Sequence, residues 1–132
     1  MIMSDTNVSK IYEKWNMLDV VLLGIGAPES SQAVRIMLDA PASEVSIPTH
    51  AVGELVANCY DRNGEYCKLP FNTQRIGIPF PLLQKASVKI GIAAEMIKRD
   101  AIFTSLKHHL INVLVTNKEM ADHLIERPLD EI

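Results

Sequence analysis

An amphipathic stretch near the start of the chain is followed by an apolar run. Apolar side chains in the first stretch recur at intervals of three and four, which predicts a helix with one apolar face. They are Val8, Ile11, Tyr12 and Trp15. Asp5 or Thr6 is suited to cap this helix, which we expect to run to about residue 17. Residues 18–25 show almost no polar alternation, and this pattern is typical of a central parallel strand buried on both faces.

The rest of the chain alternates between strand and helix patterns. The Asn63-Gly64 pair lies between two extended segments and predicts a β-hairpin, because both residues tolerate a positive φ. Residues 39–50 have no regular pattern. The remaining expected elements are a helix capped by Ser30 or Ser31 and running to residue 38, strands at 76–78, 87–93 and 110–115, a helical turn at 81–85, a helix at 98–109, and a last helix that Thr116 or Asn117 caps and Pro128 ends.

These elements predict an α/β fold with a Rossmann-like three-layer αβα architecture. The sheet should be mostly parallel, with right-handed crossovers and a small β-hairpin excursion. A chain of 132 residues with 48% apolar content is long enough for one core, so residues 1–132 are expected to form a single domain. Three core strands leave two exposed sheet edges, which folded proteins normally cover. We therefore expect the chain either to self-associate or to be a piece of a larger domain.

Composition excludes several function classes. The formal net charge is −3 and no basic block stands out, so the chain alone should not bind nucleic acid. No window reaches the roughly 18 apolar residues of a membrane span, and the first residues do not resemble a secretory signal, which predicts a cytoplasmic protein. Cys59 and Cys67 could form a disulfide across the hairpin, but two free thiols are favoured in a reducing compartment.

Three short segments offer candidate binding residues. Ligands of open α/β sheets gather at the carboxyl ends of strands, and Gly24 and Gly26 lie at the end of the first strand. Their turn either holds a ligand or only packs tightly. Lys98 opens a helix, where a cation opposes the helix dipole and favours a bound anion such as phosphate; a solvated lysine is the alternative. Glu54 in "HAVGEL" could accept hydrogen bonds from sugar hydroxyls, or it could be a solvated strand residue.

Catalytic and metal chemistry find no support in the sequence. His108 and His109 are adjacent, so a helix would point them about 100° apart rather than toward one metal ion. Neither a nucleophile elbow nor a paired set of catalytic side chains is present. We expect no metal, no cofactor and no catalytic residue, and the chain is not predicted to be an enzyme.

Four segments, in order and with similar gaps, resemble the effector-binding domain of SorC-type bacterial transcriptional regulators. The segments are "LDVVLLGIGAP", "HAVGELVANCYDRNGE", "RIGIPFPLLQ" and "KIGIAAEMIKRDAIFTSLKHHLINVLVTNKEMADHLI". The resemblance spans about residues 8–125. It implies a fold similar to sugar-phosphate isomerases and glucosamine-phosphate deaminases, with a phosphorylated sugar bound as an inducer. It also implies that the chain corresponds to the last two-fifths of a regulator, without the DNA-binding helix-turn-helix.

The resemblance also implies roles for individual residues. Glu54 falls in the segment whose carboxylate contacts the sugar, and Lys98 falls on the helix-start lysine that reaches the phosphate. Gly24 and Gly26 form the strand-end loop, and Arg35 is a weaker phosphate candidate.

One departure from the family pattern concerns the phosphate. Family members usually have Gly-Gly shortly before the lysine, whereas this chain has Ala94-Glu95. A carboxylate there would repel a phosphate. The leading hypothesis is therefore a sugar-phosphate-sensing and oligomerisation domain fragment of a transcriptional regulator, with a homo-oligomer as the expected state. The alternatives are an isomerase-like or deaminase-like enzyme that uses Glu54 as a general base, and a self-association module that binds no ligand.

Overall fold

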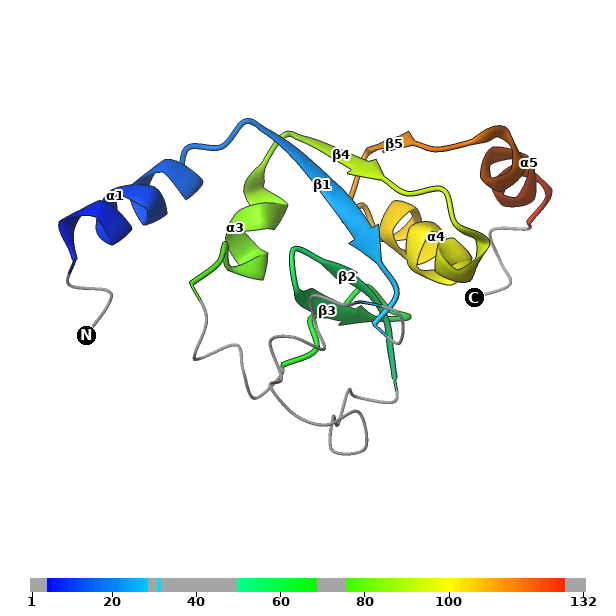
Figure 1. Ribbon diagram of the computed structural model, residues 1–132, viewed down its shortest axis with the longest axis horizontal. Coiled ribbons are helices and arrows are strands. Elements are labelled where there is room, and N and C mark those ends of the chain that lie inside the picture. Colours follow the sequence, from blue (N-terminus) through cyan, green and yellow to red (C-terminus); the bar gives the residue numbers. More distant parts are fainter. Residues whose placement is uncertain (1–4, 29–30, 32–49, 69–75, 128–132) are drawn as a thin grey trace.

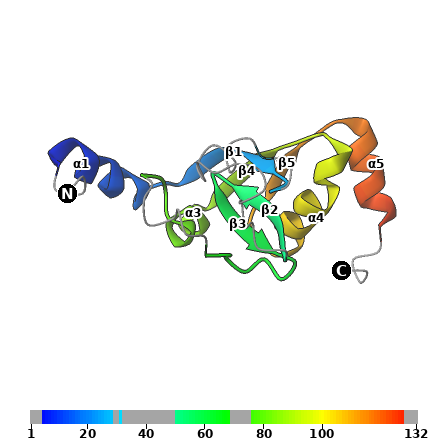
Figure 2. The same cartoon turned by 60° about the horizontal axis from the view of Figure 1, so that its bottom comes forward.

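The computed structural model describes residues 5–28, 31, 50–68 and 76–127 of the chain (Figure 1). The first helix, α1 (Thr6–Trp15), begins where the sequence predicts, because the Asp5 carboxylate accepts hydrogen bonds from the backbone N–H groups of Asn7 and Val8. No residue of α1 is buried, and the helix projects from one end of the molecule (Figures 1 and 2).

Five strands form one mixed sheet in the order β3-β2-β1-β4-β5. The strands β1 (Val20–Gly26), β4 (Val88–Ile92) and β5 (Val113–Val115) pair in parallel. The strands β2 (Ala51–Leu55) and β3 (Asn58–Asp61) extend the sheet in antiparallel pairings. The α/β class is confirmed, and the sheet is mixed rather than the narrow three-stranded core that the sequence predicts.

The helices α3 (Phe80–Lys85) and α4 (Arg99–Lys107) lie on one side of the parallel strands (Figure 1). The residue Ile102 of α4 and the strand residues Leu23 and Ile25 belong to one buried cluster. The final helix, α5 (Lys118–Glu126), begins at Asn117, whose side chain accepts from the N–H of Met120. This layer of helices and the inner face of the sheet make the core.

The expectation that the first strand is buried on both faces is wrong. Leu23 and Ile25 are 6% and 2% exposed, whereas Val20 and Leu22 are 54% and 67% exposed. Successive strand residues point to opposite faces, so only one face of β1 is covered among the described residues. An apolar run indicates which residues favour burial, but it does not indicate whether another layer of the molecule covers them.

The hairpin region contains two turns where the sequence predicts one. The expected turn is present: the Asp61 N–H donates to the Glu65 carbonyl, and Gly64 has φ 74°. A second, tighter turn joins β2 to β3 through Val56 and Ala57, which have φ values of 52° and 58°. Two residues with positive φ are typical of a type I′ hairpin turn. This turn is invisible in the sequence because neither residue is one that favours it.

Other predicted elements differ in their bounds or cannot be compared. Residues 76–78 are not a strand, and β5 starts three residues later than predicted. Asn112 precedes β5, and its side chain accepts from the Lys89 N–H and donates to the Ser87 carbonyl, which ties the chain to β4 before strand pairing begins. A short 3-10 turn, η3 (Met96–Lys98), precedes α4. The helix expected up to residue 38, residues 39–49 and Pro128 lie outside the described residues.

Cys59 and Cys67 are buried free thiols, as the favoured interpretation predicts. Their backbones face each other, since the Cys67 N–H donates to the Cys59 carbonyl at 2.8 Å. Burial raises the pKa of the Cys67 thiol. Among the described helices, none is long and apolar enough to cross a bilayer.

Candidate functional site

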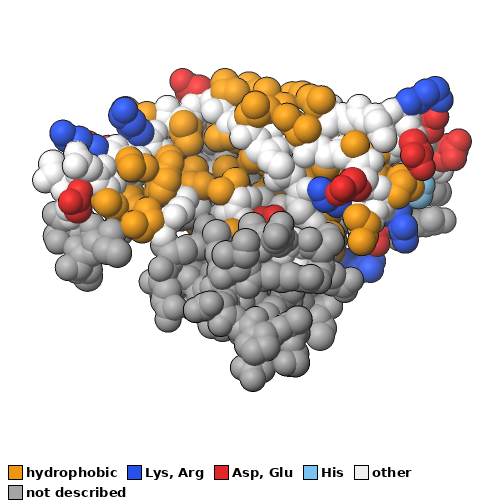
Figure 3. Space-filling view, in the orientation of Figure 1, with side chains coloured by type: hydrophobic (Ala, Val, Ile, Leu, Met, Phe, Trp, Pro, Cys, Tyr) orange, Lys and Arg blue, Asp and Glu red, His pale blue; other side chains and the backbone are white. Residues whose placement is uncertain are grey.

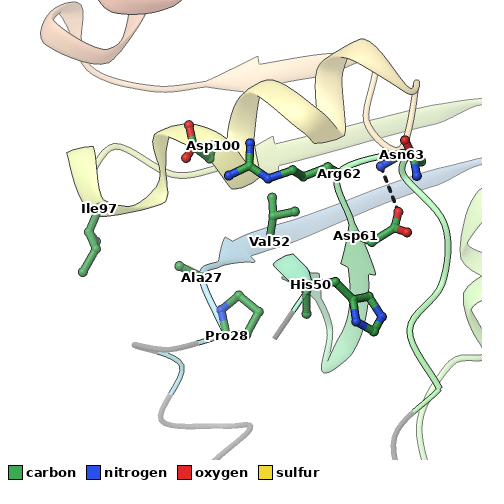
Figure 4. Close-up of a pocket in the computed structure, with 10 residues that line it drawn as sticks. Ala27, Pro28, His50, Val52, Asp61, Arg62, Asn63, Ile97 and Asp100 are labelled. Carbon is green, nitrogen blue, oxygen red and sulfur yellow. Dashed lines mark hydrogen bonds between the residues drawn. The ribbon is translucent and has the colours of Figure 1, made fainter. Parts of the chain in front are cut away.

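A cavity of about 420 Å³ lies beyond the carboxyl end of β1 (Figure 4). Four segments that are distant in the sequence line it: residues 27–28 after β1, residues 50–52 at the start of β2, residues 61–63 after β3, and Ile97 with Asp100 at the start of α4. Parallel strands bring their carboxyl ends to one edge, and a ligand of an open α/β sheet binds there. The cavity has the position that the sequence predicts for a ligand.

Polar side chains from two elements meet at this cavity. In Figure 4 the Arg62 side chain extends from the end of β3 toward Asp100 on α4. His50 and Asn63 also line the cavity. The Asp61 carboxylate accepts from the backbone N–H groups of Asn63 and Glu65, both at 2.9 Å, and this fixes the turn. A cation, carboxylates and an amide around one cavity suit a polyhydroxy ligand.

Asp100 joins the cavity to the last helix of the described chain. Its carboxylate accepts from Nη1 of Arg127 at 2.8 Å, and the Arg127 guanidinium lies 4.7 Å from the centre of the Phe103 ring. The hydrogen bond from Arg127 is the main cause that lowers the pKa of Asp100, with further contributions from the charges of Arg127, Arg99 and Arg62. Asp100 therefore stays ionised and held in place at neutral pH.

Glu54 lies directly over Gly26, its partner in the β1–β2 pairing. A Cβ atom at Gly26 would come within 2.3 Å of the Glu54 Oε1 atom, so a larger residue there would force the Glu54 carboxylate to move. Oε1 accepts from the Ser31 hydroxyl at 3.1 Å, and Oε2 accepts from the Ala57 N–H at 2.6 Å. The carboxylate thus lies at the end of β1 and holds the tight β2–β3 turn. The sequence did not reveal this second role.

Lys98 is the last residue of η3 and the cap of α4, and the nearby residues Ile97 and Asp100 line the cavity. Its Nζ atom is 2.6 Å from the Glu95 carboxylate, and the side chains of Lys98 and Glu95 are 25% and 67% exposed. The Glu95 carboxylate therefore pairs with the lysine itself. A phosphate that approaches Lys98 would have to displace Glu95.

The remaining predicted residues divide by location. Gly24 is on the exposed face of β1, with open space where a Cβ would be, and it does not line the cavity. Arg35 lies outside the described residues. The structure thus places Gly26 and Glu54 together at the end of β1, but Gly26, Glu54 and Lys98, like Gly24, are not among the residues that line the cavity.

Sequence reasoning missed the most prominent polar residues of the cavity, which are His50, Arg62, Asn63 and Asp100. The signal for Arg62 and Asn63 was the turn sequence Asp-Arg-Asn-Gly at the end of an expected strand. Across the described ranges, no three His, Cys, Asp or Glu side chains gather as a metal site would require.

Comparisons with known proteins show the family of the chain. Residues 1–126 match the family described as "Putative sugar-binding domain". The sorbitol operon regulator of Klebsiella pneumoniae is 30% identical over 127 residues, which are 95% of this chain and 40% of that protein. The transcriptional regulator LsrR of Escherichia coli K12 is 31% identical over 72 residues, or 54% of this chain and 23% of that protein.

Solved structures extend the likeness to the fold. The full-length sorbitol operon regulator SorC from Klebsiella pneumoniae superposes with a TM-score of 0.82 over 95% of this chain and 41% of that chain, at 30% identity. A DeoR family transcriptional regulator from Listeria monocytogenes gives a TM-score of 0.80 at 19% identity over 92% of this chain and 50% of that chain, which shows a shared fold. The chain spans about two-fifths of the length of the sorbitol operon regulator. It belongs to the family of putative sugar-binding domains that is represented among SorC-type transcriptional regulators.

Proposed function

We propose that this chain is the effector-sensing and oligomerisation part of a transcriptional regulator of carbohydrate metabolism, and that its effector is a phosphorylated sugar. The observation that carries the proposal is the cavity of about 420 Å³ at the strand ends, which four segments of a sugar-binding-domain family member line with polar groups. A cavity of this size suits a ligand as small as a monosaccharide phosphate.

The proposed roles follow the chemistry of each group. Arg62, Asn63 and His50 offer hydrogen bonds to hydroxyl groups at the cavity. Glu54 lies against Gly26 and so orients the end of β1. One of its oxygens accepts a hydrogen bond from the Ser31 hydroxyl, and in the complex this oxygen would accept from a sugar hydroxyl instead. Lys98 is the phosphate ligand at the start of α4, with Gly26 in the adjoining strand end. Arg35 is a further candidate for the phosphate.

The regulator's response would come from thermodynamic linkage between ligand binding and the packing of its copies. A ligand that contacts β1, the β2–β3 hairpin and α4 together favours the conformation in which all of them close on it. In a homo-oligomer this conformation changes how the copies pack, and thereby the affinity of a helix-turn-helix domain of the same regulator for its operator. The chain itself contributes sensing and assembly rather than DNA contacts, in keeping with its net charge of −3.

The enzyme alternative has less support. The Asp100 carboxylate is paired with Arg127, which lowers its pKa, so it is not a proton donor at neutral pH. Both oxygens of Glu54 accept hydrogen bonds from this chain. The relatives are named as transcriptional regulators.

Calorimetric titration of the chain with a panel of monosaccharides, polyols and their phosphates tests the proposal. We expect one sugar phosphate to bind, with at least a tenfold loss in the Lys98→Met variant. Lys118→Met is the matched control, because Lys118 is an exposed lysine at the start of α5. The proposal is overturned if no sugar or sugar phosphate produces heat at millimolar concentration, or if both lysine variants lose affinity equally.

A further inference from the structure

Residues 59–67 form a β-hairpin whose turn carries two cavity residues, Arg62 and Asn63. We call residues 59–67 the cavity hairpin. Cys59 lies in β3 before the turn, and Cys67 lies in the returning segment. Both cysteines are reduced and buried in this structure. The cavity hairpin therefore has two thiols at its base and two cavity residues at its turn.

The two cysteines are direct partners across the cavity hairpin. Tyr60 pairs with Tyr66 in an antiparallel bridge, and this register places Cys59 opposite Cys67. The Cys67 N–H donates to the Cys59 carbonyl at 2.8 Å, as this register requires. Directly opposite residues of an antiparallel pair point their side chains to the same face of the sheet. The two thiols therefore lie on one face, side by side.

The spacing of such a pair suits a disulfide. Opposite residues that are hydrogen-bonded across an antiparallel pair have Cα atoms about 5.5 Å apart, and disulfides span Cα distances of about 4.4–6.8 Å. Their Cβ atoms are about 4.5–5.5 Å apart, compared with about 3.5–4.5 Å in a disulfide. An approach of about 1 Å therefore closes the bond while the strand register stays as it is.

The returning segment is the more weakly held side of the cavity hairpin. Within the described chain, a single bridge joins residues 65–67 to β3, and the Tyr66 ring stacks on Phe80 with ring centres 5.3 Å apart. β3 is also paired with β2 along its length. Weakly paired segments open at a low cost in free energy. Opening exposes Cys67 first, and Cys59, which is 0% exposed, remains beside it.

The thiols lie apart from the bare face of the sheet. Exposed apolar side chains of the parallel strands gather over β1, β4 and β5 (Figure 3), whereas β3 is at the opposite edge of the sheet, beyond β2. Both partners of the thiol pair belong to one hairpin of this chain. The chemistry of the pair therefore does not depend on what covers the bare face.

We propose that Cys59 and Cys67 form a reversible disulfide by exchange with a low-molecular-weight disulfide such as oxidised glutathione, and that this bond fixes the turn at the cavity. The Cys67 thiolate attacks one sulfur of the small disulfide and releases one small thiolate. The Cys59 thiolate then attacks the Cys67 sulfur and releases the second. The two protein thiols lose two protons and two electrons, and the small disulfide takes up both to become two thiols.

The disulfide acts on the turn because the turn belongs to the same short hairpin. The Asp61 carboxylate accepts from the N–H groups of Asn63 and Glu65, both at 2.9 Å, and these bonds set the shape of the turn. A crosslink at the base removes the openings in which the returning segment leaves β3. Arg62 then keeps one position relative to the cavity. If the proposed function holds, a sugar phosphate meets a hairpin that is already ordered.

Thiol alkylation and mass spectrometry test the bond. The full chain is equilibrated in mixtures of reduced and oxidised glutathione, quenched in acid and alkylated in urea. We expect Cys59 and Cys67 to be lost to alkylation together, with no glutathione attached, and to return on treatment with dithiothreitol. The exchange equilibrium constant should be at least about tenfold larger for the folded chain than for the chain in urea, because the register holds the two thiols together.

Hydrogen exchange tests the effect on the turn. The amides of Asn63 and Glu65 should exchange at least about fivefold more slowly in the oxidised chain than in the reduced chain. The amides of Asn7 and Val8 are the matched control, because they donate to the Asp5 carboxylate in the same way at the start of α1, and their exchange should not change.

Three results would overturn the proposal. The first is a chain whose thiols stay reduced in excess oxidised glutathione, or form the bond no more readily when folded than in urea. The second is a disulfide between two chains in place of the bond within one. The third is an oxidised chain in which Asn63 and Glu65 exchange as fast as before. In the Cys67→Ser control, Cys59 should stay available to alkylation. None of these measurements uses a sugar, so they are independent of the proposed function.

Discussion

The ion pair between Glu95 and Lys98 sets the charge that a ligand meets at the start of α4. The two groups are 2.6 Å apart, and Glu95 is largely exposed. An exposed pair contributes little to stability, so its main consequence concerns ligands. We expect Glu95→Gln to raise the affinity for the sugar phosphate about tenfold, because the phosphate no longer competes with a carboxylate for Lys98.

Calorimetry with the sugar phosphate and with its unphosphorylated form measures this effect. The affinity for the unphosphorylated form should not change in Glu95→Gln. Glu119→Gln is the control, since Glu119 occupies the first turn of α5. An equal change for both ligands would show that Glu95 does not act on the phosphate.

Both residues of the tight hairpin turn, Val56 and Ala57, have a positive φ, and Val56 is the bulkier of the two. Val56 is a β-branched residue with φ 52° and a side chain exposed to solvent, and this conformation costs a non-glycine residue about 1–2 kcal/mol. Glycine at this position would relieve the strain, but the greater conformational entropy of the unfolded chain would offset roughly 0.5–1 kcal/mol of the gain in stability. We therefore expect Val56→Gly to stabilise the protein by up to about 1 kcal/mol in urea unfolding.

A matched substitution gives the opposite sign. Val20 is similarly exposed but lies in an extended strand, so Val20→Gly should destabilise the protein. If Val56→Gly also destabilises it, the turn is not strained. This turn shows why a sequence alone cannot locate every hairpin: the Glu54 carboxylate holds the Ala57 N–H, and that tertiary contact overrides local turn preference.

Among the elements, α4 and the segment after α5 are joined by the Arg127–Asp100 ion pair. Because the pKa of Asp100 is lower in the folded state than its ordinary value of 3.8, the pair stabilises the fold above that value. The stabilisation is lost as the pH falls through the lower, folded pKa. Between pH 6 and pH 3, the wild type should therefore lose more stability than Arg127→Gln.

Thermal unfolding at several pH values checks this difference. The two melting temperatures should be furthest apart at pH 6 and should approach each other as the pH falls below 3.8. Lys118→Gln removes an exposed ion pair with Asp122 and serves as the control, since exposed pairs contribute little. A constant gap between wild type and Arg127→Gln at all pH values would mean that packing on Phe103, rather than charge, accounts for the contribution of Arg127.

Element types were predictable where periodicity was strong. The helix capped by Asp5, the strands around Leu23 and Ile90, and the helix capped by Asn117 all appear at their expected places. The predicted bounds of a strand were wrong where a side chain makes the hydrogen bonds in place of the backbone, as Asn112 does before β5. The cavity's strand-end position followed from topology. Its polar lining did not, because Arg62 and Asp100 lie far apart in the sequence and meet only in the folded chain.

At the scale of the whole molecule, one sheet face is packed and the other is open. Apolar runs predicted burial on both faces, because side chains such as Leu22 and Ile92 favour an environment without water. Leu22 is 67% exposed and Ile92 is 46% exposed on the open face, so the described residues cover only one half of what the pattern predicts. An apolar pattern therefore indicates which residues favour burial, but it does not indicate which part of a molecule covers them.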